Sequence, residues 1–256
     1  MSVDDPQSPA WRAHGMRANR LAMAKPKTQV ARRKRRSSTL PPIERLSELA
    51  YRAILAGLFD RRVPAGAFLS QSELMQMVDV PVQPLRDALR LLETEGILKI
   101  HPRSGIEFLK ADLELARSTY QFRSVIERAA VRAYASSVEA GEIEILIADH
   151  RALDERLGAE GTSDAVRTSM EELEGRFHGS LISAMRNPMI ETTAQRLKTY
   201  VALIRMDVRV TPQMMARTIQ EHLDVLEACL TRDAEAAEAA LSQHFQAAMQ
   251  RILGMV

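Results

Sequence analysis

Apolar residues recur every three or four positions along most of this chain, a spacing typical of helices that bury one face. A first helix is predicted after Pro41-Pro42, with a buried stripe formed by Ile43, Leu46, Leu49, Ala50, Ala53, Ile54 and Leu58. A short helix follows, and its predicted buried positions are Leu74, Met77 and Val78. Asp79 stands where the chain must then reverse, and Asp tolerates the left-handed backbone conformation better than most residues.

A longer helix is predicted to begin near Pro84, because the first turn of a helix tolerates proline, whose missing N–H would have no partner there. Its buried positions should be Leu85, Ala88, Leu89 and Leu92. Its open side would carry Gln83, Arg86, Asp87, Arg90 and Glu93. After Gly96, two apolar runs separated by residues 101–105 predict a strand, a turn and a second strand. Together these elements indicate a winged helix-turn-helix, which places its second helix in the major groove of DNA.

From Ala111 onward, glycine and proline become sparse and helical spacing dominates. Turn signals divide this region into six predicted helices, roughly 111–138, 142–157, 164–185, 189–208, 213–229 and 233–252. An all-helical bundle is the economical architecture for such a pattern. The predicted fold class is therefore mainly α, with an N-terminal winged helix-turn-helix followed by an all-helical bundle of about six helices.

Charge is distributed unevenly along the chain, and this adds a third region. Residues 1–40 contain ten Lys or Arg and two Asp, a net charge of +8, whereas the whole chain carries +2. Residues 41–110 carry nine basic and nine acidic side chains, so the predicted winged helix is itself neutral. We therefore expect a disordered basic arm over residues 1–40, a DNA-binding domain over 41–110 and a helical domain over 111–256.

The basic arm admits two interpretations. It is either a solvated tail or the product of a start codon assigned too early, since Met16 and Met23 could also begin the chain. Alternatively, it follows DNA phosphates beside the winged helix and supplies the nonspecific affinity that a neutral domain lacks. In that case the contacting residues would be Arg32, Arg33, Lys34, Arg35 and Arg36.

Cysteine content and hydropathy bear on the compartment. The single cysteine, Cys229, excludes a disulfide framework and fits a reducing environment. No apolar run approaches the roughly 18 residues of a membrane span, and the N-terminus lacks the apolar stretch of a secretory signal. We therefore expect a soluble cytoplasmic protein without a membrane partner.

Four polar residues of the helical region form a candidate metal site. Glu174 and His178 are four residues apart on one predicted helix, so they point the same way, while His222 and His244 lie on the fifth and sixth helices. A bundle that joins these helices would converge three imidazoles and a carboxylate, a ligand set for a transition metal. The alternative is a metal-free bundle with a polar pocket. His150, in contrast, stands among charged neighbours and is expected to be solvated.

The stretch from Leu46 to Leu109 resembles the DNA-binding half of the GntR superfamily of bacterial transcription regulators. The matching residues are Ala65-Gly66, Leu69, Leu74, Val80, Pro84, Leu85, Arg86, Ala88, Leu89, Leu92, Glu95-Gly96 and Gly105. The family's Ser-Arg-Thr is Pro81-Val82-Gln83 here, and its turn glycine is Asp79. The resemblance implies that the protein binds a double-stranded DNA operator. In addition to the arm residues, the predicted contacts are Ser72, Val82, Gln83, Arg86, Arg90, Arg103, Ser104 and Gly105.

The helical region resembles the FCD domain, the effector-binding half of many GntR regulators. The family's motifs appear in order as Arg123 with Glu127, Glu174-Gly175-Arg176-Phe177-His178, Asn187-Pro188, Glu221-His222 and His244. The resemblance implies a divalent transition metal held by Glu174, His178, His222 and His244, with zinc favoured and nickel or manganese as alternatives. Glu174 replaces the family's aspartate, which moves the carboxylate by about one bond and can change metal preference.

Arg123 has two candidate roles. It could pair with Glu127 one helical turn away, or it could grip the carboxylate of a ligand with its planar guanidinium. By resemblance to carboxylate-sensing FCD regulators, we favour the second role.

These observations predict a homodimeric bacterial transcription regulator, acting as repressor or activator and associated with the nucleoid. Its helical domain would sense a small carboxylate effector over the metal and alter the spacing of two winged helices. One alternative is a metal-dependent enzyme in a helical bundle, but no nucleophile or phosphate-binding loop accompanies the histidines. Another is a regulator-derived scaffold with weakened DNA binding, suggested by Pro81-Val82-Gln83.

Overall fold

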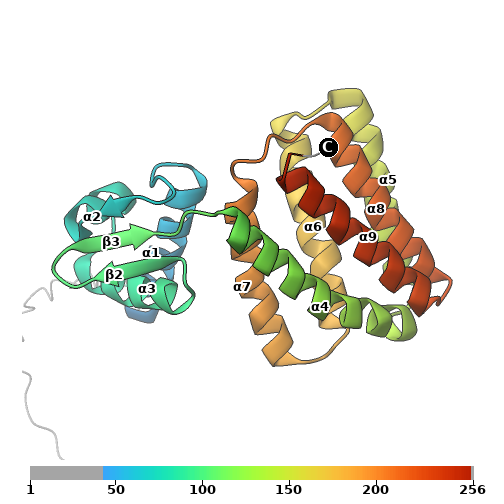
Figure 1. Ribbon diagram of the computed structural model, residues 1–256, viewed down its shortest axis with the longest axis horizontal. Helices are drawn as coiled ribbons and strands as arrows, with labels where there is room; N and C mark the ends of the chain where they lie inside the picture. The colour runs from blue at the N-terminus through green and yellow to red at the C-terminus, as the bar shows by residue number, and fades with distance from the viewer. Residues whose placement is uncertain (1–42, 255–256) are drawn as a thin grey trace, which may run out of the picture. The chain divides into compact units, whose positions relative to one another are not determined.

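The computed structural model describes residues 43–254, with side chains from Leu46 onward (Figure 1). The first elements are α1 (Ile43–Phe59), β1 (Phe68–Leu69), α2 (Gln71–Val78), α3 (Val82–Thr94), β2 (Leu98–His101) and β3 (Gly105–Phe108). The strands form an antiparallel sheet in the order β1-β3-β2, with Leu69 opposite Ile106 and Lys99 opposite Glu107. The predicted winged helix-turn-helix is confirmed. Strand β1 was not predicted, because two residues are too few for an alternating pattern.

Local capping explains why the chain turns between α2 and α3. The Ser70 side chain accepts the Glu73 N–H, and the Glu73 carboxylate accepts the Ser70 N–H at 2.7 Å, a reciprocal cap that begins α2. Asp79 ends this helix in the left-handed conformation, with φ 50° and ψ 53°, as its position predicts. Helix α3 begins at Val82, so Pro84 lies in its first turn, where the absent N–H costs nothing.

Two residues predicted to lie in the core of this region are exposed. Leu49 is 53% exposed and Met77 is 38% exposed. In α1 the fully buried row is Ala50, Ile54 and Leu58, and in α2 it is Leu74 with Val78. Each buried row is spaced by four residues, so a neighbour three residues along falls at its edge. The prediction was wrong because it assumed that each helix buries a wider stripe of residues than it does.

The rest of the described chain folds into six helices, and the predicted bundle is confirmed. These are α4 (Leu113–Ser137), α5 (Ala140–Glu160), α6 (Asp164–Ser183), α7 (Pro188–Arg205), α8 (Pro212–Leu230) and α9 (Ala234–Ile252). Five of them begin at a residue whose side chain accepts a backbone N–H: Asp112, Ser163, Asn187, Thr211 and Asp233. These caps fix the residues at which the five helices begin.

The bundle helices share one core. Helix α9 packs against α4 and α8, α5 packs against α6 and α8, and α6 also packs against α4 (Figure 1). Their apolar faces form a cluster of buried residues that includes Phe177 of α6, Leu226 of α8 and Phe245 of α9. Because α6, α8 and α9 all border this core, polar residues on their inner faces are brought together away from water. Within residues 43–254, none of the helices combines the length and apolarity that a membrane span requires.

Candidate metal centre and nucleic-acid interface

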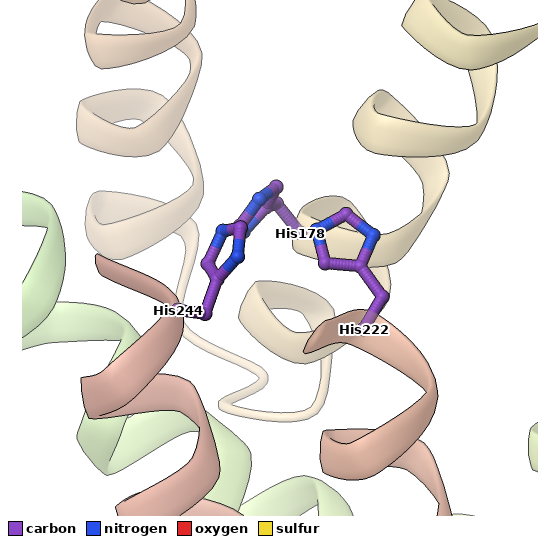
Figure 2. A group of neighbouring side chains, drawn as sticks. All are labelled: His178, His222 and His244. Atoms are coloured by element: carbon purple, nitrogen blue, oxygen red, sulfur yellow. The ribbon is translucent and has the colours of Figure 1, made fainter. Parts of the chain in front are cut away.

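Three histidines from three helices converge inside the bundle. His178 belongs to α6, His222 to α8 and His244 to α9, and one ring nitrogen from each lies within 4.8 Å of the other two. Figure 2 shows the rings turned toward one another. His222 and His244 are buried, and the His178 side chain is only 11% exposed. A cluster of this kind could bind a metal ion, since imidazole nitrogens are preferred ligands of transition metals.

Each of these histidines is held by a second residue through its Nδ1 atom. His178 Nδ1 lies 2.5 Å from Glu127 Oε2, and His244 Nδ1 lies 2.8 Å from Glu221 Oε2. Because a carboxylate only accepts hydrogen bonds, both rings carry their proton on Nδ1. Arg123 in turn donates to Glu127 at 2.8 Å, and Arg251 makes two hydrogen bonds with Glu221, at 2.6 and 2.7 Å. The two anchoring carboxylates are therefore themselves fixed.

His222 is anchored by another histidine. His150 Nδ1 lies 2.7 Å from the Leu146 carbonyl oxygen, and His150 Nε2 lies 3.0 Å from His222 Nδ1. A carbonyl can only accept, so His150 carries its proton on Nδ1 and accepts the His222 Nδ1–H with its other nitrogen. His222 is thereby set in the same tautomer as His178, with the Nε2 lone pair free.

The Nε2 atoms are the part of the cluster that lacks partners. In the described part of the chain, His178 Nε2 and His222 Nε2 are buried and have no hydrogen-bond partner. Buried polar atoms are nearly always hydrogen-bonded or bound to an ion, because leaving them unpaired costs about 1–3 kcal/mol each. Orphaned lone pairs held by fixed Nδ1–H donors fit a metal ion, and this donor arrangement is usual for histidine ligands.

Glu174 lies beside the histidines but is held by an arginine. Its Oε1 is 3.8 Å from His222 Nε2, and its Oε2 is 3.9 Å from His178 Nε2. Arg205 of α7 donates to Glu174 Oε2 through Nη1 at 2.6 Å. Arg205 was not predicted as a site residue, because no spacing links it to the histidine motifs. The carboxylate therefore stands between the histidine cluster and a guanidinium.

Burial and neighbouring charges keep this centre in the protonation state that binds metal. Burial lowers the pKa of His178 against the opposing effect of Glu127, and burial together with His244 lowers the pKa of His222. Burial alone would raise the pKa of Glu174, but Arg205 and the histidines outweigh it and hold that pKa well below its usual value. Neutral imidazoles beside an ionised carboxylate are the forms that coordinate a cation.

The expectation that His150 is solvated was wrong. The side chain is fully buried, and its ring contacts Phe177 edge-on at 5.8 Å between centroids. Its immediate neighbours Asp149 and Arg151 are charged and suggested a solvated position. The helical stripe is the better signal, because Ile143, Leu146, Ile147 and Leu153 place position 150 on the inner face of α5.

Arg123 takes the intrahelical pairing that was the less favoured of its two predicted roles. Both side chains of the Arg123–Glu127 pair are more than nine-tenths buried. The guanidinium also lies over the rings of Tyr120 and Phe245, at 5.6 and 5.3 Å from their centroids. Burial would raise the pKa of Glu127, but Arg123 and His178 reverse this and lower it to about 2. Arg123 thus acts on the cluster through Glu127, and its predicted grip on a ligand stays a prediction.

A cavity of about 180 Å³ adjoins the histidine cluster. Glu174 and Arg205 line it together with Tyr120 of α4, Thr218 of α8 and Arg251 of α9. Arg205 Nε also lies 3.3 Å from the Tyr120 hydroxyl. None of the three histidines lines this cavity, but Glu174 does and lies within 3.9 Å of two of them, so it stands between the cluster and the cavity.

A second hollow lies between helix α3 and the wing. Arg86 and Arg90, four residues apart on α3, share it with Arg103, Ser104 and Gly105 of the wing, and its volume is about 390 Å³. Arg86, Arg90, Arg103 and Ser104 are exposed. Three cations on one concave face form a surface suited to the phosphates and base edges of DNA.

Three further predicted DNA contacts, Ser72, Val82 and Gln83, are exposed but lie outside this hollow. Ser72 on α2 lies with its hydroxyl 3.0 Å from that of Ser70, and Val82 is 43% exposed. Gln83 donates to Asp87 at 3.3 Å. The predicted contacts Arg32, Arg33, Lys34, Arg35 and Arg36 fall outside the residues that the structure describes.

Gly105 has a structural reason for its place in the wing. Its φ is 149°, and a Cβ atom there would lie 2.7 Å from the Phe68 ring and 2.8 Å from the Leu69 carbonyl oxygen. A side chain would therefore separate β1 from β3, and the tip of the wing depends on this close backbone approach.

Comparisons with known proteins agree with this architecture. Residues 46–108 match the family of bacterial regulatory proteins called gntR, and residues 118–247 match the FCD domain. The HTH-type transcriptional repressor RspR of Escherichia coli is 27% identical over 213 residues, covering 81% of this chain and 89% of the relative. An uncharacterized HTH-type regulator of Bacillus subtilis, YdhC, is 25% identical over 76% of this chain and 85% of its own length.

Solved structures share the fold. A transcriptional regulator of the GntR type from Rhodococcus sp. RHA1 aligns with a TM-score of 0.64 at 20% identity, over 84% of this chain and 98% of its own. McbR/YncC of Escherichia coli aligns with a TM-score of 0.65 at 14% identity, over 84% and 99%. The matched families are regulators of transcription rather than enzymes. The chain therefore belongs to the GntR family of transcriptional regulators, with an N-terminal GntR helix-turn-helix and a C-terminal FCD domain.

Proposed function

We propose that this regulator senses a small carboxylate through a divalent transition metal and converts its binding into a change of DNA affinity. The observation that carries the proposal is the pair of buried, unpartnered Nε2 atoms of His178 and His222, held by fixed Nδ1–H donors beside His244. Such an arrangement stabilises the protein only when a cation or another group satisfies these lone pairs.

The residues that would hold the metal are His178, His222 and His244, with Glu174 as a fourth ligand once it is released from Arg205. Zinc is favoured for a nitrogen-rich set, with nickel and manganese as alternatives. The metal supplies positive charge and an open position for an anionic ligand. Arg123 is a second candidate contact for the carboxylate of the effector. It can bind the effector only when its ion pair with Glu127 opens, and otherwise it acts on the cluster through Glu127.

We extend this proposal to the division of the chain into domains. Residues 1–40 would be a basic arm, 41–110 the DNA-binding domain and 111–256 the effector-binding domain, in a homodimer of the bacterial cytoplasm that associates with the nucleoid. A two-fold dimer presents two α3 helices to two operator half-sites, and an effector that changes their spacing changes affinity. Genomic footprinting with the purified full chain would identify the operator, and loss of footprints on metal removal or effector addition would test the coupling.

Replacing Arg86 with Ala should weaken binding to that operator by about 1–3 kcal/mol, because an exposed arginine at the start of α3 can contact base edges in the major groove. The thermal midpoint should stay nearly unchanged, since the side chain is exposed. Arg209→Ala removes the same charge from an exposed position outside the α3 and wing hollow and should leave operator affinity nearly intact. Equal affinities of the two variants in gel-shift titrations would refute the assigned docking face.

Deleting residues 1–38 should weaken binding to all DNA sequences by a similar factor and flatten the salt dependence of affinity. The segment carries ten Lys or Arg, whereas residues 41–110 are neutral overall. Phosphate contacts release counterions whatever the base sequence, so their loss lowers the slope of log affinity against log salt. The slope, measured by fluorescence anisotropy at several salt concentrations, would remain the same if the segment does not touch DNA.

A further inference from the structure

We propose that the effector is a monocarboxylate with a short apolar chain, rather than a polyhydroxylated acid. This inference rests on the proposed carboxylate-sensing function and narrows it to one ligand class. It is drawn from the lining of the cavity beside the histidine cluster, which combines apolar and charged side chains.

One part of the cavity wall is apolar and adaptable. It is formed by Met170, Val208, Val210, Met214, Met215 and Ile252. These residues come from α6, the segment after α7, α8 and α9, so the apolar lining is not a single helix face. Methionine side chains adjust to irregular shapes, and burying a hydrocarbon chain against them removes apolar surface from water.

Charged side chains also line the cavity: the three arginines Arg167, Arg205 and Arg251, with Glu171 and Glu174. Arg205 is paired with Glu174, whose oxygens lie 3.8 Å from His222 Nε2 and 3.9 Å from His178 Nε2. Of the three arginines that line the cavity, Arg251 is committed to Glu221 by two hydrogen bonds. Arg205 binds Glu174 through Nη1 only, and its Nη2 has no hydrogen-bond acceptor among the described residues. Arg167 is exposed and donates its Nε to the Thr162 carbonyl oxygen at 3.1 Å. Arg205 is therefore the cation beside the histidine cluster with an N–H to offer, and it suits one carboxylate group.

Thr218 and Tyr120 are the two uncharged polar side chains that line the cavity, and each already makes one hydrogen bond. The Thr218 hydroxyl donates to the Met214 carbonyl oxygen at 3.0 Å, and the Tyr120 hydroxyl accepts from Arg205 Nε at 3.3 Å. A ligand with several hydroxyl groups would place most of them against methionine and valine side chains. Each unpaired buried hydroxyl opposes binding, so a polyhydroxylated acid should be rejected.

The size of the cavity limits the chain length. Its volume is about 180 Å³. That space accommodates a compact acid with a few methylene groups. Hexanoate and gluconate are suitable probes, because both have six carbons and one carboxylate and differ in the hydroxyl groups along the chain.

The test is calorimetric titration of the zinc-loaded full chain with hexanoate and with gluconate. Hexanoate should bind about tenfold or more tightly than gluconate, because only gluconate leaves hydroxyls unpaired. Equal or tighter binding of gluconate would overturn the inference and leave carboxylate sensing intact. Failure of both acids to bind would also overturn the inference, whereas the proposed function is tested separately by the loss of footprints on metal removal.

Variants locate the binding to the cavity. Met214→Gln places an amide in the apolar wall at a partly exposed position and should weaken hexanoate binding by about fivefold or more. Met189→Gln is the matched control, because Met189 is 80% exposed and outside the lining. Val210→Thr is a second lining variant, and it should not disturb the fold because Val210 is 37% exposed. Unchanged hexanoate affinity in both lining variants would refute this site.

Discussion

Protein purified without a chelator should contain close to one transition-metal ion per chain, and the His222→Ala protein should lose most of it. His222 is fully buried, and its ring lies beside those of His178 and His244. The hydrogen bond from His222 Nδ1 to His150 leaves the Nε2 lone pair of His222 free on the side of these two rings. Removing this imidazole leaves two histidines and a carboxylate already paired with Arg205, a set too small to retain zinc through purification. Inductively coupled plasma mass spectrometry on both proteins gives the metal content directly.

The matched control is His101→Ala. His101 also forms a hydrogen bond to a carboxylate, with its Nε2 2.7 Å from Glu107, but it lies in the wing and outside the cluster. Its variant should keep the full metal content. A wild-type protein that carries no metal and still binds its effector at full strength would reduce the three histidines to ordinary polar groups of the bundle.

The fold could be predicted from sequence because its signals are local. Asp79 in the turn, Pro84 in the first turn of α3 and the capping residues that begin five bundle helices each act on neighbouring residues. Strand β1 was missed because its two residues gain their structure only by pairing with β3. The exposure of Leu49 and Met77 depends on how much of each helix the neighbouring elements cover. The spacing of apolar residues along the chain carries no information about that coverage.

The candidate site was predictable in its ligands but not in its supports. His178, His222 and His244 stand in motifs that can be read along the chain. In contrast, His150 and Arg205 contribute through contacts across 72 and 31 residues of sequence, and neither belongs to a recognisable motif. Arg123 was ambiguous for a physical reason: a guanidinium four residues from Glu127 can serve that carboxylate or a ligand, and only the packing decides.

Acidification of the metal-free protein should destabilise it steeply below about pH 6.5. Burial lowers the pKa of His150, His178 and His222 in the folded state, while the unfolded chain titrates near 6.5. Below that pH the unfolded chain binds protons that the folded protein excludes. Stability is therefore fully present above about pH 6.5 and falls as the pH decreases, with a slope of up to about 4 kcal/mol per pH unit for three protons.

Urea unfolding of chelator-treated protein between pH 5 and 8 measures this slope, and His150→Gln supplies the matched comparison. Glutamine can still accept the His222 Nδ1–H but does not titrate, so the slope should decrease by about 1.4 kcal/mol per pH unit, the share of one proton. The lowered pKa values of Glu127, Glu174 and Glu221 act in the same direction, but at lower pH, where carboxylates titrate. An unfolding free energy that stays constant from pH 7 to pH 5 would mean that the folded cluster takes up protons freely, and the buried, neutral histidines described above would then be wrong.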